Sequence, residues 1–330
     1  MPFGKLPVGL AGCGYWGRNL ARNLYQMGHL HAVCDTSAKA LKEVKASYRG
    51  VKTTRDFADL LKDTKLKAVA VAAPAADHYD LARRALLAGK DVFVEKPLAL
   101  RVPQAEELVE LARARKRVLM VGHILEYHPA ILKLKGLVDA GELGDIHYVY
   151  SNRLNLGKVR QEENILWSFA PHDISVILLL VGAMPEWAST SGQHYLQHDV
   201  ADVTMTCLSF PGKARAHIFV SWLHPFKEQK LVVVGSKKMA VFDDVIKEGK
   251  LKIFDKGIEW KDGRPVTRQT AESTLFFPET EPLREELAHF VECVRSRKTP
   301  RTDGANGLRV LRVLDACQRS IAGNGQPVRL

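Results

Sequence analysis

The feature that most constrains the fold of this chain is a glycine-rich turn near the amino terminus. Residues 12–17 read Gly-Cys-Gly-Tyr-Trp-Gly, a G-x-G-x-x-G pattern. The apolar run Leu6 to Ala11 precedes it and predicts a buried strand, and the segment from Asn19 to about Gly28 follows it with the periodicity of an amphipathic helix. This order of strand, glycine turn and helix is typical of a dinucleotide-binding βαβ unit.

Each glycine has its own role in such a turn. Gly12 permits the tight change of direction, Gly14 lets the backbone approach a pyrophosphate, and Gly17 lets helix and strand pack closely. The amino end of the following helix presents backbone N–H groups to the phosphates. Tyr15 and Trp16 belong to the same loop and are further candidate cofactor contacts.

An acidic residue follows the second predicted strand. The run Leu30 to Cys34 ends in Asp35. A carboxylate in this position accepts hydrogen bonds from the adenosine ribose and repels a 2′-phosphate. The next residues, Thr-Ser-Ala-Lys, contain no arginine. The sequence therefore favours NAD over NADP, although Lys39 weakens the distinction.

Small residues follow another predicted strand, Lys67 to Ala73. Because the carboxyl ends of parallel strands share one edge of the sheet, we expect Ala73 and Pro74 near the nicotinamide end of the cofactor. His78 comes shortly afterwards. It is either a cofactor contact or a capping and packing residue.

The triplet Glu95-Lys96-Pro97 follows the apolar run Val92 to Val94, which has the pattern of a strand buried on both faces. Pro97 cannot donate a ladder hydrogen bond, so the strand ends here. Two charged groups thus stand at the sheet edge where ligands bind in open α/β folds. We expect Glu95 and Lys96 to contact the cofactor, and Lys96 also to contact the substrate. The alternative is a salt-bridged surface loop.

The alternation of strands and helices stops near Gly122, and we place a domain boundary there, between residues 1–122 and 123–330. Long alternating runs in the second part predict a mostly antiparallel sheet with one covered and one open face. These runs are Ile146 to Asn155, Ala201 to Phe210, Ala214 to Trp222, Leu231 to Val234 and Met239 to Phe242. The predicted fold class is an α/β Rossmann domain followed by an α+β domain, whose terminal helices can pack back on the first.

Composition limits the possible partners. The net charge is +11, with 46% hydrophobic and 26% charged residues. Most of the basic residues are spread singly, without the interleaved aromatics of a nucleic-acid surface, so we expect small anionic ligands and no nucleic acid. No apolar run reaches the length of a membrane span, and five scattered cysteines lack a Cys-x-x-Cys pair. We expect a cytoplasmic protein without a membrane contact.

A second chemical candidate lies in the segment Trp167 to Ser175, which contains Pro171-His172-Asp173. A proline at the first helical position would put His172 in the first turn, where the helix dipole lowers the imidazole pKa and favours a neutral base. The alternative is a histidine that caps the helix and packs on Trp167. No metal site is expected, because the pair His194 and His198 lacks an accompanying glutamate motif.

With these motifs the chain resembles the Gfo/Idh/MocA oxidoreductases over nearly its whole length. The resemblance rests on the 12–17 turn, Asp35, the Glu95-Lys96-Pro97 triplet and the His172 segment. It implies a Rossmann domain and an open-faced sheet domain that associates into homodimers or homotetramers. It also implies that Lys96 orients the reacting hydroxyl and that His172 abstracts its proton.

Within that family the chain looks like the branch that oxidises nucleotide-activated sugars such as UDP-N-acetylglucosamine (UDP-GlcNAc) and its uronic acid. The segments 121–129, 153–157 and 171–173 carry this likeness. The candidate substrate-binding residues, besides Lys96 and His172, are Tyr127, Arg153, Asn155 and Arg160. For Tyr127 the alternative is packing, and for the other three it is a solvated loop.

One departure from the family pattern concerns Ser168. Many members have an aspartate four residues before the histidine, and this chain has serine there. The neighbouring Asp173 is no simple replacement, because adjacent residues point apart on a helix. Together with the motifs, the resemblance implies an NAD-dependent dehydrogenase that acts on a secondary hydroxyl, C3, of a UDP-linked N-acetylated sugar. The alternatives are a dehydrogenase of a free sugar or inositol, and a catalytically silent NAD-binding regulator.

Overall fold

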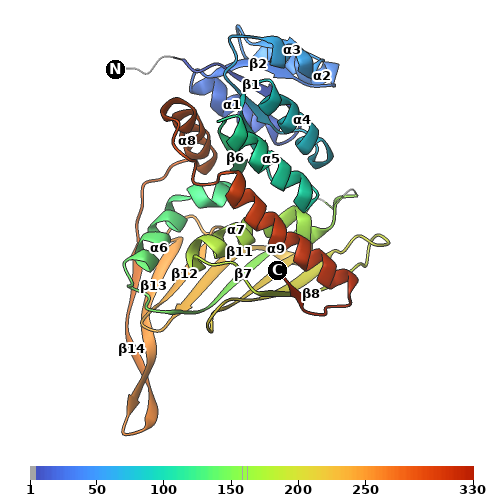
Figure 1. Ribbon diagram of the computed structural model, residues 1–330. Coiled ribbons are helices and arrows are strands. Elements are labelled where there is room, and N and C mark those ends of the chain that lie inside the picture. Colours follow the sequence, from blue (N-terminus) through green and yellow to red (C-terminus); the bar gives the residue numbers. More distant parts are fainter. Residues whose placement is uncertain (1–4, 158, 162) are drawn as a thin grey trace. The chain divides into compact units, whose positions relative to one another are not determined.

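The computed structural model describes residues 5–157, 159–161 and 163–330 (Figure 1). The chain divides into two compact units. The first contains residues 1–124 and 281–311, and the second contains residues 125–280 and 312–330. The long helix α9 (Gly304–Ala322) begins in the first unit and ends in the second.

The first unit is built on a six-stranded parallel sheet with the order β3-β2-β1-β4-β5-β6. The strand order reverses between β1 and β4, the position where Rossmann folds bind dinucleotides. The strands are β1 (Val8–Ala11), β2 (Leu30–Cys34), β3 (Lys52–Thr54), β4 (Ala68–Val71), β5 (Asp91–Glu95) and β6 (Leu119–Gly122). Every residue of β1, β4, β5 and β6 is buried, as expected for parallel strands covered on both faces.

Helices alternate with these strands. They are α1 (Gly17–Gln26), α2 (Ala38–Ser47), α3 (Phe57–Lys62), α4 (Ala75–Leu87) and α5 (Val102–Ala114), and α8 (Pro282–Ser296) joins them from the far end of the chain. Arg22 on α1 forms a two-pronged ion pair with Glu281, next to the start of α8. The Rossmann domain expected from the glycine turn is confirmed.

The second unit is built on a nine-stranded sheet with the order β14-β13-β12-β11-β7-β10-β9-β8-β15. Neighbouring strands are antiparallel except for β7 and β10, which run parallel. The strands are β7 (Ile146–Leu156), β8 (Trp187–Gln193), β9 (Val203–Ser209), β10 (Arg215–Ser221), β11 (Leu223–Gly235), β12 (Met239–Asp243), β13 (Leu251–Lys261), β14 (Arg264–Leu275) and β15 (Val328–Arg329). The mostly antiparallel sheet is confirmed.

One face of this sheet is covered by helices (Figure 1). The short 3-10 helix η1 (Ile124–Tyr127) leads into α6 (Pro129–Asp139), which packs on β12, and α7 (Ile165–Val181) packs on β7, β9 and β10. Along β9 and β10 buried and exposed residues alternate, so every second side chain points to the open face. The paired strands β13 and β14 project from the edge of the sheet as a long hairpin (Figure 1).

The prediction that Pro171 starts a helix is wrong. Helix α7 begins at Ile165, because the side chain of Asn164 caps it by accepting a hydrogen bond from the Trp167 N–H at 3.2 Å. Asparagine is a strong capping residue, and it fixes the start. Pro171 therefore lies inside the helix, where its missing N–H costs one backbone hydrogen bond.

No helix among the described residues is long and apolar enough to cross a membrane.

Candidate active site

The glycine-rich turn has the geometry of a phosphate-binding loop. Gly12 has a φ of +89°, and a Cβ atom on it would lie 2.6 Å from the backbone of Ala72. A Cβ on Gly17 would lie 2.2 Å from the Gly12 carbonyl oxygen. At Gly14, in contrast, a Cβ would meet no atom within 4 Å. Gly12 and Gly17 are thus required by the protein itself, whereas Gly14 borders open space that fits the pyrophosphate of a dinucleotide.

The Asp35 carboxylate is anchored beside this turn. Its two oxygens accept hydrogen bonds from the backbone N–H groups of Cys13, at 2.6 Å, and Ser37, at 2.7 Å. Each carboxylate oxygen has a second lone pair, so both can still accept a ribose hydroxyl. Asp35 therefore holds the turn in place and stays suited to the adenosine ribose.

Glu95, at the end of β5, is buried and bound to the glycine-rich turn. Its Oε1 accepts a hydrogen bond from the Trp16 indole N–H at 2.6 Å. Gly122, opposite in β6, leaves the necessary room, because a Cβ there would lie 3.0 Å from the Glu95 carboxylate. Burial raises the pKa of Glu95 to about 7. Glu95 and Trp16 were both expected as cofactor contacts, and here they contact each other. Tyr15, in the same loop as Trp16, is 88% exposed.

His78 lies in the first turn of α4 and is buried. Its Nδ1 lies 2.7 Å from the Pro97 carbonyl oxygen, and its Nε2 lies 2.9 Å from the Ala73 carbonyl oxygen. Burial lowers its pKa. Both ring nitrogens thus face the backbone, which favours the packing interpretation. The side chain connects the loop of Ala73 and Pro74 to the segment that carries Lys96.

Lys96 is half-buried at the end of β5 and lies close to a residue that the motifs did not indicate. His123, directly after β6, is 1% exposed. Burial and the positive charge of Lys96 lower the pKa of His123 to about 3. This imidazole therefore stays neutral and adds no second cation beside Lys96. The pairing of β5 with β6 brings the two residues together, and no local sequence signal could have shown it.

In the second unit His172 is half-buried in the middle of α7, not in its first turn. The dipole effect is concentrated at helix ends, so the argument from a position in the first turn does not apply to His172. Ser168 is buried one turn before His172 on the same side of the helix. The next residue, Asp173, points toward the sheet instead.

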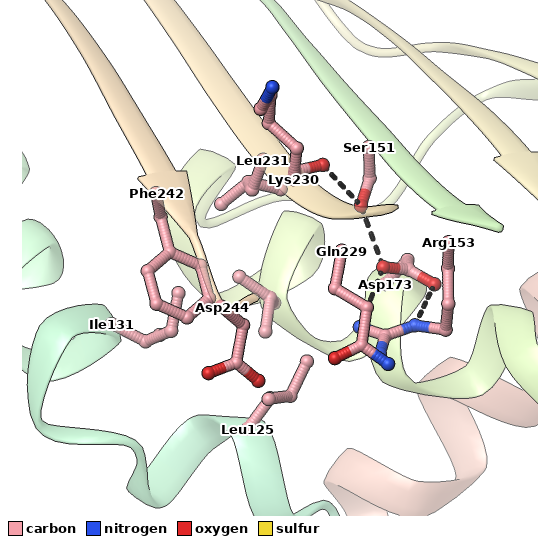
Figure 2. Close-up of a pocket in the computed structure, with 11 residues that line it drawn as sticks. Leu125, Ile131, Ser151, Arg153, Asp173, Gln229, Lys230, Leu231, Phe242 and Asp244 are labelled. Carbon is pink, nitrogen blue, oxygen red and sulfur yellow. Dashed lines mark hydrogen bonds and ion pairs between the residues drawn. The ribbon is translucent and has the colours of Figure 1, made fainter. Parts of the chain in front are cut away.

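Asp173 takes part in a buried polar cluster that Figure 2 shows. One carboxylate oxygen accepts from the Ser151 hydroxyl at 2.6 Å and from Arg153 Nη2 at 3.1 Å, and the other accepts from Arg153 Nε at 2.9 Å. Ser151 and Arg153 both come from β7. Arg153, expected to bind substrate, is therefore held by the helix that carries His172.

This cluster forms one wall of a small pocket on the helix-covered face of the sheet (Figure 2). Its volume is about 260 Å³, part of which opens to solvent. Asp244, at the opposite wall, accepts a hydrogen bond from Lys250 at 2.8 Å, and its carboxylate lies 3.5 Å from His128 Nε2. Most of the remaining lining is apolar, although Gln229 and Lys230 also line the pocket. The apolar residues are Leu125, Ile131, Val176, Leu231 and Phe242.

The other candidate substrate residues differ in their surroundings. The side-chain oxygen of Asn155, on β7, is buried and has no hydrogen-bond partner among the described residues, which suits a polar ligand. Arg160 forms a half-exposed ion pair with Glu163 at 3.0 Å. Tyr127 is 2% exposed, which favours packing.

The first unit thus brings together the glycine-rich turn, Asp35, Glu95, Lys96, His78 and His123, and the second brings together Arg153, Asp173 and the helix of His172. Within the part of the chain that the structure describes, no group of three or more His, Cys, Asp or Glu side chains could hold a metal ion.

These features define a two-domain oxidoreductase with a dinucleotide-binding Rossmann domain. The family models agree. Residues 6–123 match the oxidoreductase family, NAD-binding Rossmann fold, and residues 135–330 match the oxidoreductase family, C-terminal alpha/beta domain. The chain belongs to the Gfo/Idh/MocA oxidoreductase family, and the expected enzyme class is confirmed.

Relatives in the family have different substrates. UDP-N-acetylglucosamine 3-dehydrogenase of Acidithiobacillus ferrooxidans is 27% identical over 92% of this chain and 93% of its own. A solved structure of the enzyme of that name and organism has a TM-score of 0.86 at 25% identity, over 98% of this chain and all of that one. The NAD-dependent scyllo-inositol 2-dehydrogenase of Bacillus subtilis is 26% identical over 98% of this chain and 95% of its own.

Proposed function

We propose that this enzyme oxidises a secondary hydroxyl, that on C3, of a UDP-linked N-acetylated sugar to a ketone, with NAD as the oxidant. The observation that carries the proposal is the likeness to UDP-N-acetylglucosamine 3-dehydrogenase, which spans nearly the full length in both sequence and structure. The fold supplies what the reaction needs, a cofactor cradle in the first unit and the helix of His172 in the second.

In this reaction bound NAD would supply the acceptor for the hydride. The N–H groups of the turn around Gly14 would hold its pyrophosphate, and Asp35 would accept hydrogen bonds from the adenosine ribose. The Lys96 ammonium donates a hydrogen bond to the reacting hydroxyl and orients it. A ring nitrogen of His172 accepts the hydroxyl proton as a general base. Asn155, Arg160 and Arg153 remain candidates for contact with the sugar or the diphosphate.

Asp35 supports the proposed preference for NAD over NADP. A 2′-phosphate would bring negative charge against a carboxylate that is fixed by Cys13 and Ser37 and cannot swing away. One basic group lies nearby, since Arg55 Nε donates to the Thr36 carbonyl oxygen at 3.2 Å. Titrating the protein with each cofactor tests the preference, and tighter binding of NADP would refute it.

Inositol is the second candidate substrate. The Bacillus subtilis relative that covers 98% of this chain is an inositol dehydrogenase, and its substrate carries no nucleotide. In this case Lys96 and His172 would act on a hydroxyl of the inositol ring. The positive charge of the chain would then attract only the phosphates of the cofactor.

A thermal-shift titration with NAD present tests the choice. The ligands are UDP, UDP-N-acetylglucosamine, its uronic acid and myo-inositol. A ligand at 100 times its dissociation constant adds about 2.7 kcal/mol to the stability of the folded state, which raises the melting temperature measurably. We expect stabilisation by UDP and the UDP-sugars. Stabilisation by inositol alone would overturn the proposed substrate.

We also propose that the enzyme is cytoplasmic and forms homodimers or homotetramers through the open face of its sheet. Large side chains are exposed on that face, among them Met205 at 58%. Light scattering measures the oligomer, and a monomer would refute the assembly.

A further inference from the structure

The residue after the proposed base, Asp173, is held by three hydrogen bonds to side chains of β7. Asp173 accepts two parallel hydrogen bonds from one edge of the Arg153 guanidinium and a third from Ser151 (Figure 2). The fork of arginine matches the two oxygens of a carboxylate, so the pair fixes direction as well as distance.

This pair is also well buried. The Asp173 side chain is 2% exposed and that of Arg153 is 12% exposed. Removing one charge of such a pair leaves the other buried and uncompensated, so the pair resists separation. It therefore fixes a contact of α7 that solvent cannot easily replace.

The partner strand is a rigid support. Strand β7 lies inside the nine-stranded sheet, paired with β10 on one side and β11 on the other. Arg153 pairs with Val220 and Gln229 in these two ladders. An anchor on this residue ties α7 to the middle of the sheet.

Adjacent residues on an α-helix point about 100° apart, because there are 3.6 residues per turn. Fixing Asp173 against β7 therefore fixes the rotation of α7 about its own axis, and with it the direction of His172. We infer that the Arg153–Asp173 pair positions His172 for proton transfer. This inference rests on the proposed function, in which His172 is the base.

The inference gives Arg153 another role than the one expected from the sequence. A direct substrate contact would bind the sugar, so its loss would raise KM. A positioning residue acts through His172, so its loss lowers kcat and leaves KM for the sugar nearly unchanged. A misplacement of a catalytic group by 1 Å can cost about 100-fold in rate.

The test compares Asp173→Asn and Arg153→Lys with Asp244→Asn as a control. Asp244 lines the same pocket and has partners on elements other than α7, namely His128 and Lys250. Each of the three variants loses or weakens an ion pair, so each should unfold at a lower temperature than wild type. Only the first two should lower kcat, by about 100-fold for Asp173→Asn.

A second readout does not need turnover. In ¹H–¹³C spectra of the whole chain, the ring signals of His172 are identified by their loss in His172→Asn. They should move in Asp173→Asn and Arg153→Lys and stay in place in Asp244→Asn. If wild type turns over no sugar, the proposed function fails, and these spectra still decide whether the pair positions His172.

Three results would overturn the inference. The first is unchanged kcat in folded Asp173→Asn. The second is a raised KM for the sugar with unchanged kcat in Arg153→Lys, which would make Arg153 a substrate contact. The third is His172 ring signals that stay in place in Arg153→Lys, which also decides the question if Asp173→Asn does not fold.

Discussion

The two units hold their candidate functional residues, the cofactor half and the base half, in different ways. In the first unit the cofactor half is mostly backbone, a turn in which Gly12 and Gly17 admit no side chain and an acid that binds two N–H groups. In the second unit the proposed base depends on side chains, because Arg153 and Asp173 hold the helix of His172. The cofactor half tolerates few residue types at its glycines, whereas the base half depends on the charges of Arg153 and Asp173. Substitutions should therefore affect the two halves differently.

The largest effect is expected from removing the proposed base, His172, or the lysine that orients the reacting hydroxyl, Lys96. His172→Asn and Lys96→Ala should each lower turnover about 10³-fold, because a positioned acid or base contributes between about 10² and 10⁴. NAD binding should remain, as measured by fluorescence titration. His198→Asn, at a side chain that is 87% exposed, is the matched control and should keep full activity. Normal turnover in either test variant would remove that residue from the mechanism.

A pH experiment tests whether burial raises the pKa of Glu95 in the first unit. Glu95 has its pKa raised from 4.5 to about 7 by burial, so the folded state holds its proton more tightly than the unfolded state. The free energy of unfolding should therefore fall as pH rises from about 4.5 to about 7 and stay low above that range. The loss is at most about 3 kcal/mol.

The variant Glu95→Gln keeps an acceptor for Trp16 but cannot ionise. Its stability to urea should lack this fall between about pH 4.5 and about pH 7. Glu43→Gln, at a half-exposed ion pair with Arg18, is the control and should follow wild type. An equal pH dependence in Glu95→Gln and wild type would show that the carboxylate is ionised throughout.

Two glycine variants separate folding from binding within the cofactor half. Gly17→Ala places a methyl group against the Gly12 carbonyl and should destabilise the first unit by about 1–3 kcal/mol. Gly14→Ala meets no protein atom, so its melting temperature should stay close to that of wild type while NAD affinity falls. Calorimetry with and without NAD measures both. A destabilised Gly14→Ala would contradict the open space beside that residue.

The sequence allowed the fold class and the first half of the site to be predicted because the constraints are local. A glycine turn between strand and helix has few alternative structures, and Asp35 and Glu95-Lys96 follow strands whose edge is known. The predicted start of this helix at Pro171 was wrong because the Asn164 side chain makes the cap, and Pro171 lies inside α7.

What could not be predicted comes from strand pairing and from contacts between distant segments. Arg153 and Asp173 meet because β7 lies under α7, and no spacing rule connects a strand residue with a helix residue across a loop. The sequence could not decide whether His78 contacts the cofactor or packs. Its two partners, the carbonyls of Ala73 and Pro97, come from separate segments. His123 lies beside Lys96 only because β5 pairs with β6.

The most direct test of the account is a turnover assay with NAD and UDP-N-acetylglucosamine deuterated at C3, with myo-inositol in parallel and His172→Asn as the blank. The account predicts that wild type forms reduced cofactor carrying the deuterium and a UDP-sugar ketone lighter by that deuterium and one proton, as seen by mass spectrometry. Reduced cofactor formed with inositol alone, or formed from the labelled sugar without deuterium, would contradict it.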